Sequence, residues 1–262
     1  MLKHANPTNK QLSQHCTQKD RYDHAKFKLS SFLLEKESDY AGFLGIDIHH
    51  HSNGTIELLQ TGLIERLLKC LHLDDTNTTI KTTPTKTEPL LKDENGPPRR
   101  ENWNYASIIG MLLYLSSNSR PDIAFAVNQC ARFSHCSKLL HELAVKRIGR
   151  YLAGTKTKGL IINPHTTLSL QMYADADFAG LWNVEDANDP TCVKSHSGYV
   201  ITLGNIPVLW GSKLQTEIAT STMHAEYIAL STSLRELIPV KSLLEEISHL
   251  YDIPCNKSTT IT

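Results

Sequence analysis

Three acidic residues are the strongest candidates for chemistry in this sequence. Asp175 and Asp177 end an apolar run typical of a strand, along which alternate side chains point to the same side. Glu226 lies in the first turns of an expected helix. Carboxylates on a strand end and on a neighbouring helix can bind one Mg²⁺, which keeps water or phosphate oxygens as its other ligands. Two such ions support in-line phosphodiester cleavage. The simpler alternative is that all three are ordinary exposed acids.

The elements that would position these acids follow from the apolar pattern after Gly154, which has the period of strands and then of helices. Strands are expected over 159–163, 167–175, 198–203 and 206–210, the last two joined by a turn at Gly204-Asn205. Helices are expected from Thr222 to about Ser233 and from Glu236 to Leu250, with Pro239 tolerated in the first turn of the second. Residues 259–262 begin another strand. From residue 167 onward, the predicted order is three strands, helical chain and a further strand.

The chain before Gly154 is expected to be mostly helical. Asn53-Gly54 between two alternating runs predicts a hairpin, and Thr61 is expected to cap a helix that carries an apolar stripe over 63–71. Residues 74–102 are rich in Thr, Pro, Asp and Lys and are expected to form an extended linker. Helices are then expected over 104–117, 121–133 and 138–152. Residues 1–39 are weakly patterned, with one short helix expected over 23–34.

Composition limits the class of protein. The 262 residues include 40% hydrophobic residues, which is enough for a packed core, and no apolar run approaches the roughly 20 residues of a membrane helix. Six scattered cysteines without a Cys-x-x-Cys pair indicate neither a disulfide framework nor a zinc ribbon. We expect an α+β or α/β protein of the cell interior, in cytoplasm or nucleus, with no membrane partner.

Charge restricts how the chain could bind nucleic acid. Lys and Arg number 27 and so do Asp and Glu, so any contact must come from a local patch. One such patch surrounds the helix expected over 138–152. Phosphates could be bound there by Lys146, Arg147, Arg150, Lys156 and Lys158. The alternative is that these side chains form a solvated helix face.

Two other groups of residues have spacings that metal sites use. His49 and His51 share one face of an expected strand, and Cys130, His135, Cys136 and His141 have a spacing close to that of zinc ligands. Adjacent histidines near a turn are usually just exposed, and Cys130 falls on the apolar face of a helix, where it would pack as a small hydrophobic residue. We therefore expect metal binding at neither group.

Four C-terminal segments, in this order, resemble the ribonuclease H domain of copia-type long-terminal-repeat retrotransposon Pol polyproteins. They are YADADFAG (173–180), KSHSGY (194–199), WGSK (210–213) and STMHAEY (221–227). Upstream, FLGIDI (43–48) resembles the hairpin that follows the polymerase palm in the same polyproteins, and residues 63–71 resemble the start of its thumb. Three later segments resemble its connection region. These are YASIIG (105–110), RPD (120–122) and RYLAGT (150–155).

The resemblance implies roles for individual residues. Asp175 matches the first metal-binding aspartate of the ribonuclease H fold, and Glu226 matches the metal-binding glutamate on its first helix. Asp177 matches a recurrent acid that does not bind metal. The implied cofactor is Mg²⁺ or Mn²⁺. The implied partners are an RNA–DNA hybrid or single-stranded nucleic acid, together with the remaining Pol regions of an intact element.

The sequence also departs from the family pattern. No Tyr-x-Asp-Asp turn precedes Phe43, and the Asp-Asn pair expected after the strand at 259–262 is absent. His224 and Leu214 replace a usual glutamate and a common basic residue. Two carboxylates would hold one metal ion only weakly, and loss of ligands that act together removes most of the rate. The resemblance therefore implies a polymerase-dead and nuclease-impaired chain.

The expected organisation has three parts. Residues 1–39 are weakly structured, 40–155 form a thumb and connection region without a palm, and 156–262 form a ribonuclease H-like domain truncated before its third acid. The open sheet edge and the apolar Leu243, Leu244 and Ile247 would favour self-association. Two further functions stay open: a non-catalytic nucleic-acid binder, and a decayed reading frame without a selected function.

Overall fold

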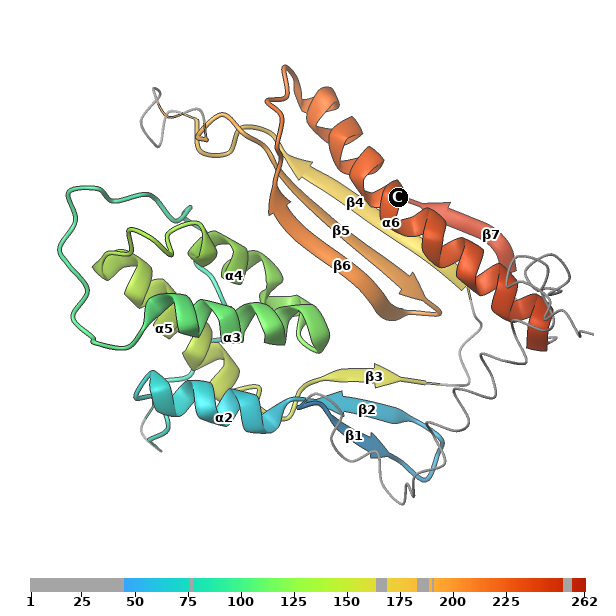
Figure 1. Cartoon of the computed structure of the whole chain (residues 1–262), viewed down its shortest axis with the longest axis horizontal. Helices are drawn as coiled ribbons and strands as arrows, with labels where there is room; N and C mark the ends of the chain where they lie inside the picture. Colours follow the sequence, from blue (N-terminus) through green and yellow to red (C-terminus); the bar gives the residue numbers. More distant parts are fainter. Residues whose placement is uncertain (1–44, 76–77, 164–168, 183–188, 190, 252–255) are drawn as a thin grey trace, which may run out of the picture. The chain divides into compact units, whose positions relative to one another are not determined.

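The computed structural model describes residues 45–75, 78–163, 169–182, 189, 191–251 and 256–262. All of them belong to the unit Gly42–Thr262, and the helix expected over 23–34 lies outside them. Five α-helices and two β-sheets make the described part an α+β structure (Figure 1). None of its helices has the length and hydropathy needed to cross a membrane.

The first sheet has three antiparallel strands in the order β1-β2-β3, namely β1 Asp47–His50, β2 Ile56–Leu59 and β3 Leu160–Ile162. The predicted hairpin joins β1 to β2. Gly54 takes a φ of +81°, which glycine adopts without strain, and its N–H donates to the carbonyl of His51. β3 comes from the region expected to be a strand after Gly154, and it pairs with β2 through Leu58 and Leu160.

Helices α2 Thr61–Cys70, α3 Tyr105–Asn118, α4 Ala124–Ala131 and α5 Leu139–Ala153 form a separate core, with a short 3-10 helix, η1 Pro121–Ile123, before α4. The helix expected over 104–117 is α3, and Asn104 is its N-cap, because its side chain accepts a hydrogen bond from the N–H of Ser107. The helix predicted after Thr61 is confirmed as α2, but its predicted cap was wrong: Gln60 is the N-cap, Thr61 is the first helical residue, and no side-chain hydrogen bond caps the helix.

The core of these helices is fully apolar at its centre. Its members include Ile64 and Leu68 of α2, Leu71 directly after α2, Leu112 of α3, and Ile148 and Leu152 of α5, all at most 1% exposed. Gly149 lets α5 approach α2 closely, because a Cβ there would lie 2.8 Å from methyl carbons of Leu71 and Leu73. The apolar stripe predicted over 63–71 therefore faces this core.

The segment between α2 and α3 contains no helix or strand in its described residues, as predicted for a linker. It is nevertheless attached to α5. The buried carboxylate of Glu142 accepts hydrogen bonds from the N–H groups of Arg100 and Glu101, at 2.8 and 3.0 Å. His141 lies 2.8 Å from the carbonyl of Leu91 through Nε2. Two neighbouring side chains at the start of α5 thus hold the end of the linker.

The second sheet has the order β6-β5-β4-β7. Its strands are β4 Ser169–Asp177, β5 His196–Leu203, β6 Ile206–Leu214 and β7 Asn256–Ile261. β4, β5 and β6 are antiparallel neighbours, whereas β7 runs parallel to β4. The predicted turn at Gly204-Asn205 has positive φ at both residues, +56° and +70°, which is the conformation of a tight hairpin turn.

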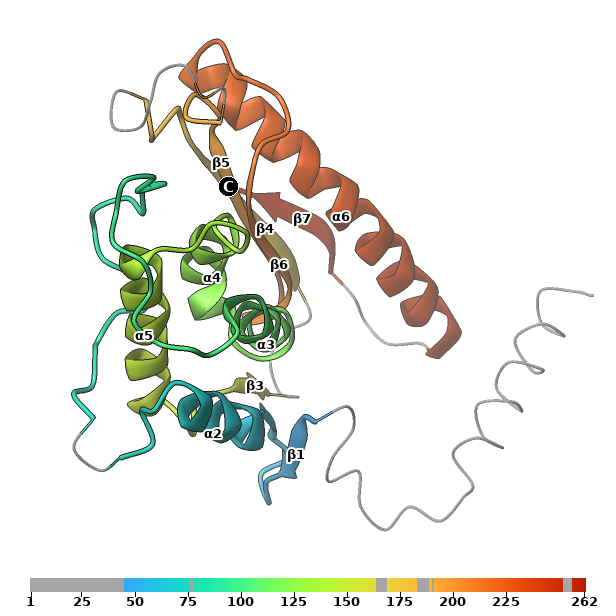
Figure 2. The same ribbon diagram turned by 60° about the vertical axis from the view of Figure 1, so that its left-hand side comes forward.

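One helix, α6 Thr222–Tyr251, replaces the two helices expected after Thr222. The prediction was wrong because the apolar stripe continues across the expected break: Leu230, Leu234, Leu237, Val240 and Leu244 all pack against Leu170, Met172 or Ile201 of the sheet. Pro239 lies inside the helix on its exposed side. Figures 1 and 2 show α6 lying along β4 and β7 over one face of the sheet.

Candidate functional site

The acidic residues of β4 project from the sheet face that α6 does not cover. Along β4, the buried Leu170 and Met172 pack against α6, and Ala176 packs against Ala225 and Ala229 at the start of that helix. Side chains alternate across a strand, so Asp175 and Asp177 point to the opposite face, where both are exposed. The structure thus places the two aspartates on one face, as predicted.

Glu226 lies at the same end of the sheet as Asp175. It is half-buried in the second turn of α6, and its chain neighbour Ala225 packs against Ala176, the chain neighbour of Asp175. The described residues contain no group of three or more His, Cys, Asp or Glu side chains that could hold a metal ion. The convergence of Asp175 and Glu226 on one ion therefore stays a prediction.

Gln215 fixes this end of α6 and was not foreseen from the sequence. Its buried side-chain amide donates to the carbonyl of Ala225 at 2.9 Å and to Ser197 Oγ on β5 at 2.8 Å. Both amide protons are therefore used to join the helix start to the sheet. Since Ala225 precedes Glu226, Gln215 also fixes the position of the Glu226 backbone relative to the sheet.

A pocket of about 600 Å³ lies over the aspartate face of the sheet. Its lining includes Asp175, Asp177 and Ser212, together with the aromatic rings of Phe125 and Trp210. Gly198 sits opposite Asp175 on β5 and leaves open space beside that carboxylate. The pocket therefore offers exposed carboxylates next to flat apolar surface.

His196 forms part of the wall of this pocket and faces Asp177 across the strand pair. Its Nε2 lies 2.8 Å from Ser212 Oγ, and the edge of its ring meets the ring of Phe125 at a centroid distance of 5.3 Å. Burial lowers the pKa of His196, although the nearby Asp177 carboxylate opposes that effect. The imidazole is therefore held in its neutral form more strongly than an exposed histidine.

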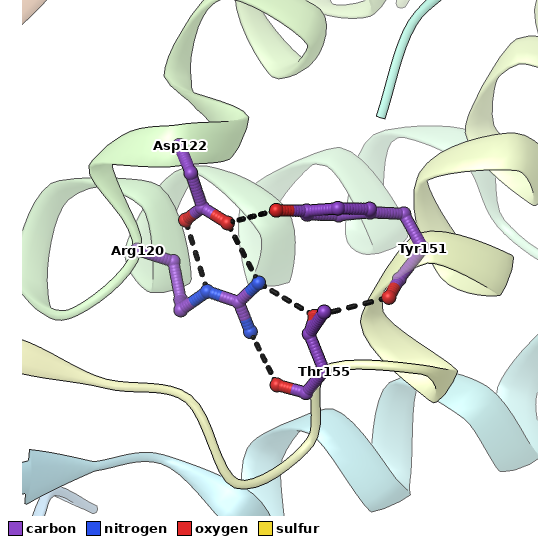
Figure 3. A network of polar contacts seen from close by, with 4 residues as sticks. All are labelled: Arg120, Asp122, Tyr151 and Thr155. Carbon is purple, nitrogen blue, oxygen red and sulfur yellow. Dashed lines mark hydrogen bonds and ion pairs between the residues drawn. The ribbon is translucent and has the colours of Figure 1, made fainter. Parts of the chain in front are cut away.

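The motifs RPD and RYLAGT, 28 residues apart, bind each other (Figure 3). The buried guanidinium of Arg120 donates to both carboxylate oxygens of Asp122 at 2.9 and 2.8 Å, and to the carbonyl and hydroxyl oxygens of Thr155 at 2.9 and 2.7 Å. The hydroxyl of Tyr151 donates to Asp122 at 2.7 Å. Every member of this network is thus tied to at least one other.

Electrostatics keeps the network charged. Burial alone would raise the pKa of Asp122, but hydrogen bonds from Arg120 and Tyr151 outweigh it and lower the pKa below its usual value. Burial and the ionised Asp122 raise the pKa of Tyr151. The network joins the start of η1 to the last turn of α5 and offers no free carboxylate oxygen for a metal. We therefore regard it as structural.

The basic residues predicted to bind nucleic acid differ in whether an acidic side chain pairs with them. The ammonium of Lys146 lies 2.6 Å from Glu101 Oε1, so its charge is already paired. Arg147 donates through Nη2 to Thr83 Oγ1 at 2.8 Å, a neutral partner. No acid in the described part of the chain pairs with Arg147, Arg150, Lys156 or Lys158. These four therefore leave positive charge available along the C-terminal half of α5 and the turn that follows.

Neither of the other two constellations brings three potential metal ligands together in the described residues. Cys130 is buried in the helical core, where burial raises the pKa of its thiol to about 12. Nδ1 of His141 accepts a hydrogen bond from the N–H of Lys138, and its Nε2 meets the carbonyl of Leu91, so both nitrogens are occupied. His51 pairs with Glu57 at 3.3 Å. Packing and hydrogen bonding account for these residues.

Comparison with known proteins identifies relatives. The chain is 35% identical over 216 residues to the retrovirus-related Pol polyprotein from transposon RE1 of Arabidopsis thaliana. This alignment covers 82% of this chain and 14% of that protein. It is 37% identical over 241 residues to the Pol polyprotein from transposon TNT 1-94 of Nicotiana tabacum, covering 88% of this chain and 17% of the relative.

A shorter relative is covered over most of its own length. The chain is 30% identical over 219 residues to a Saccharomyces cerevisiae protein described as belonging to transposon Ty5-1, covering 82% of this chain and 68% of that protein. No family model matches the chain, and no solved structure matches it significantly. The chain thus spans about one seventh of the plant polyproteins with which it aligns.

Proposed function

Because this chain belongs to the retrovirus-related Pol polyproteins of copia-type retrotransposons, we propose that β4 to β7 and α6 form a ribonuclease H-like module directed at RNA–DNA hybrids. In this proposal Asp175 and Glu226 bind one Mg²⁺ or Mn²⁺. The observation that supports it is the packing of Ala176 against Ala225. This contact sets Asp175 and Glu226 at the same end of the sheet, with Asp175 on the face away from α6.

The residues present suit a hard cation in part. Asp175 is exposed and Glu226 half-buried, so both carboxylates keep access to water, and Gly198 leaves room beside Asp175. Mg²⁺ prefers few carboxylates completed by water and phosphate oxygens. When bound, the ion would polarise a phosphodiester of the substrate. Gln215 would position Glu226 through the carbonyl of Ala225.

The same proposal predicts strongly impaired cleavage. A two-metal clamp needs more ligands than two carboxylates, and the described residues hold no group of three acidic or ligating side chains. Ligands that act as a unit lose most of the rate when some are missing. The proposed role of this chain is therefore recognition of hybrid with weak metal binding and little turnover.

A cleavage and binding assay tests this function. We expect the chain to bind an RNA–DNA hybrid with a salt-dependent affinity and to show negligible cleavage in Mg²⁺ or Mn²⁺. Turnover that Asp175→Asn abolishes would overturn the impairment. Failure to bind hybrid in preference to duplex DNA would overturn the proposed substrate class.

A non-catalytic binder of nucleic acid is the second candidate, and a separate observation favours it. Arg147, Arg150, Lys156 and Lys158 lie on and just after α5, without an acidic partner in the described part of the chain. Phosphate contacts of this kind depend on salt and not on sequence. Binding that persists when Asp175 and Glu226 are neutralised would support this second function.

A further inference from the structure

A second pocket lies between α5 and the linker, away from the carboxylates of β4. Two attachments of the linker to α5 flank this pocket: the N–H of Lys81 donates to the carbonyl of Arg150, and the carbonyl of Leu91 meets His141. Between these attachments a pocket of about 410 Å³ opens, with α4 and α5 on one side and the linker on the other. Figure 2 shows the linker passing beside α5. Sites for small ligands commonly enclose about 300–1,000 Å³.

The floor of this pocket is apolar and uncovered. Leu140 and Leu143 project from α5 and are 38% and 50% exposed. Ala144 and Ile148 continue the same surface one turn further along the helix, and Leu90 lines it from the linker. Transfer of a flat or aliphatic group from water onto such an apolar floor lowers the free energy.

The rim of the pocket is positively charged. Lys81, Lys86, Arg147 and Arg150 line it against a single acid, Glu88. The bond from Arg147 Nη2 to Thr83 fixes the guanidinium, and its buried Nε has no hydrogen-bond partner in the described part of the chain. A guanidinium fixed in this way suits a phosphate, whose oxygens match its planar set of donors. Lys156 and Lys158 extend the positive charge beyond the end of α5.

We propose that this pocket binds one nucleotide of a single-stranded nucleic acid. The base would lie on Leu140 and Leu143, and the adjoining phosphates would meet Arg147 and Arg150. A single strand is favoured because its bases are free to leave the stack, whereas a duplex keeps them paired inside. Positive charge that continues past the pocket suits a polymer with one negative charge in every unit. This site rests on the second candidate function, because it uses the same Arg147 and Arg150, and it is separate from the hybrid module, since it uses neither Asp175 nor Glu226.

The proposal is tested with the full chain and a fluorescent oligothymidylate in EDTA, which removes any contribution of metal at the carboxylates. Leu143→Asn makes the floor polar without adding charge, and we expect it to weaken binding about tenfold, the size of one lost base contact. The matched control is Leu243→Asn, which changes a similarly exposed leucine on α6. That variant should bind like the parent chain.

Two further measurements separate the base from the phosphates. A strand of the same length that is abasic at every position should bind the parent chain more weakly than oligothymidylate, and this difference should disappear in Leu143→Asn. Arg147→Gln should reduce the slope of log affinity against log salt by about 0.7, the value for one phosphate of a single strand. Unchanged thermal melting of each variant would show that the fold is kept.

Three outcomes would overturn the proposal. The first is equal affinity for normal and abasic strands. The second is binding that neither Leu143→Asn nor Arg147→Gln alters. The third concerns a leucine-containing acidic peptide. If it displaces the oligonucleotide, and if Leu143→Asn weakens binding of the peptide but not of the oligonucleotide, the pocket is a peptide site. Asp175→Asn is expected to leave oligothymidylate binding intact, so failure of the hybrid module and failure of this site give different results.

Discussion

Arg120 is a buried cation whose partners come from three places in the sequence. It is 2% exposed, and its hydrogen bonds go to Asp122 and Thr155. Tyr151 donates to the Asp122 carboxylate that Arg120 binds. A buried charge is tolerated only when it is paired and hydrogen-bonded, because leaving water costs several kcal/mol. The network therefore makes the junction between η1 and α5 specific, and it depends on all of its members.

Removal of Asp122 should destabilise the protein markedly. Asp122→Ala leaves the Arg120 guanidinium without its counter-charge, and we expect unfolding to become easier by about 2 kcal/mol, since the lost carboxylate is itself partly exposed. Tyr151→Phe removes one hydrogen bond from the same carboxylate and should cost about 1 kcal/mol. Urea unfolding with unchanged m values measures both. Equal midpoints for Asp122→Ala and the parent chain would contradict a structural role.

His141 should make stability depend on pH in a defined direction. Burial lowers the pKa of His141, and its Nδ1 accepts the N–H of Lys138, a bond that protonation at Nδ1 would break. The folded state therefore favours the neutral ring. Its contribution is present above the ordinary value of 6.5 and is lost as the pH falls below it.

The comparison with His141→Gln isolates this contribution. Denaturant unfolding at several pH values between 7.5 and 5 should show a smaller loss of stability in the variant than in the parent chain. The lowered pKa of His196 acts in the same direction, so some pH dependence should remain in the variant. Parallel curves for the two chains would contradict the assignment to His141.

Local patterns predicted most helices and strands, and they failed where tertiary packing decides. The turns at Asn53-Gly54 and Gly204-Asn205 depend on neighbours within a few residues, so the sequence was sufficient for them. Pro239 gave the opposite result. Its missing N–H suggested a helix start, but the continuous contacts of Leu237 and Val240 with the sheet favour one helix through the proline.

The single helix α6 leads to a prediction for Pro239. Proline in a helix interior costs roughly 3 kcal/mol, partly offset by its smaller entropy in the unfolded chain. Pro239→Ala should therefore raise the free energy of unfolding by about 2 kcal/mol in urea denaturation. If residue 239 instead began a second helix, alanine would lower stability slightly by freeing the unfolded chain. A decrease would contradict the continuous helix.

Across the whole molecule, the candidate site was predicted only as far as single elements allow. Strand alternation placed Asp175 and Asp177 on one face, which the register of β4 confirms. The role of Gln215 and the meeting of Arg120 with Thr155 could not be predicted, because each joins residues whose proximity arises only from the packed fold. No local period encodes such pairs.

The free edge of β7 should cause self-association. β7 pairs with β4 on one side, and within the described residues no strand covers its other side. Ile261 is 48% exposed there, and an uncovered apolar edge is a template for pairing with another chain. Sedimentation velocity should show concentration-dependent association that Ile261→Lys reduces and Ile261→Val does not. A monomer at all concentrations would contradict this expectation.

A manganese titration of the intact chain, followed by electron paramagnetic resonance, decides whether Asp175 and Glu226 share one ion. We predict one weak site that is lost equally in Asp175→Asn, in Glu226→Gln and in the double variant, while Asp177→Asn retains it. Manganese binding that survives unchanged in either single variant would contradict the proposal that these two carboxylates share one ion.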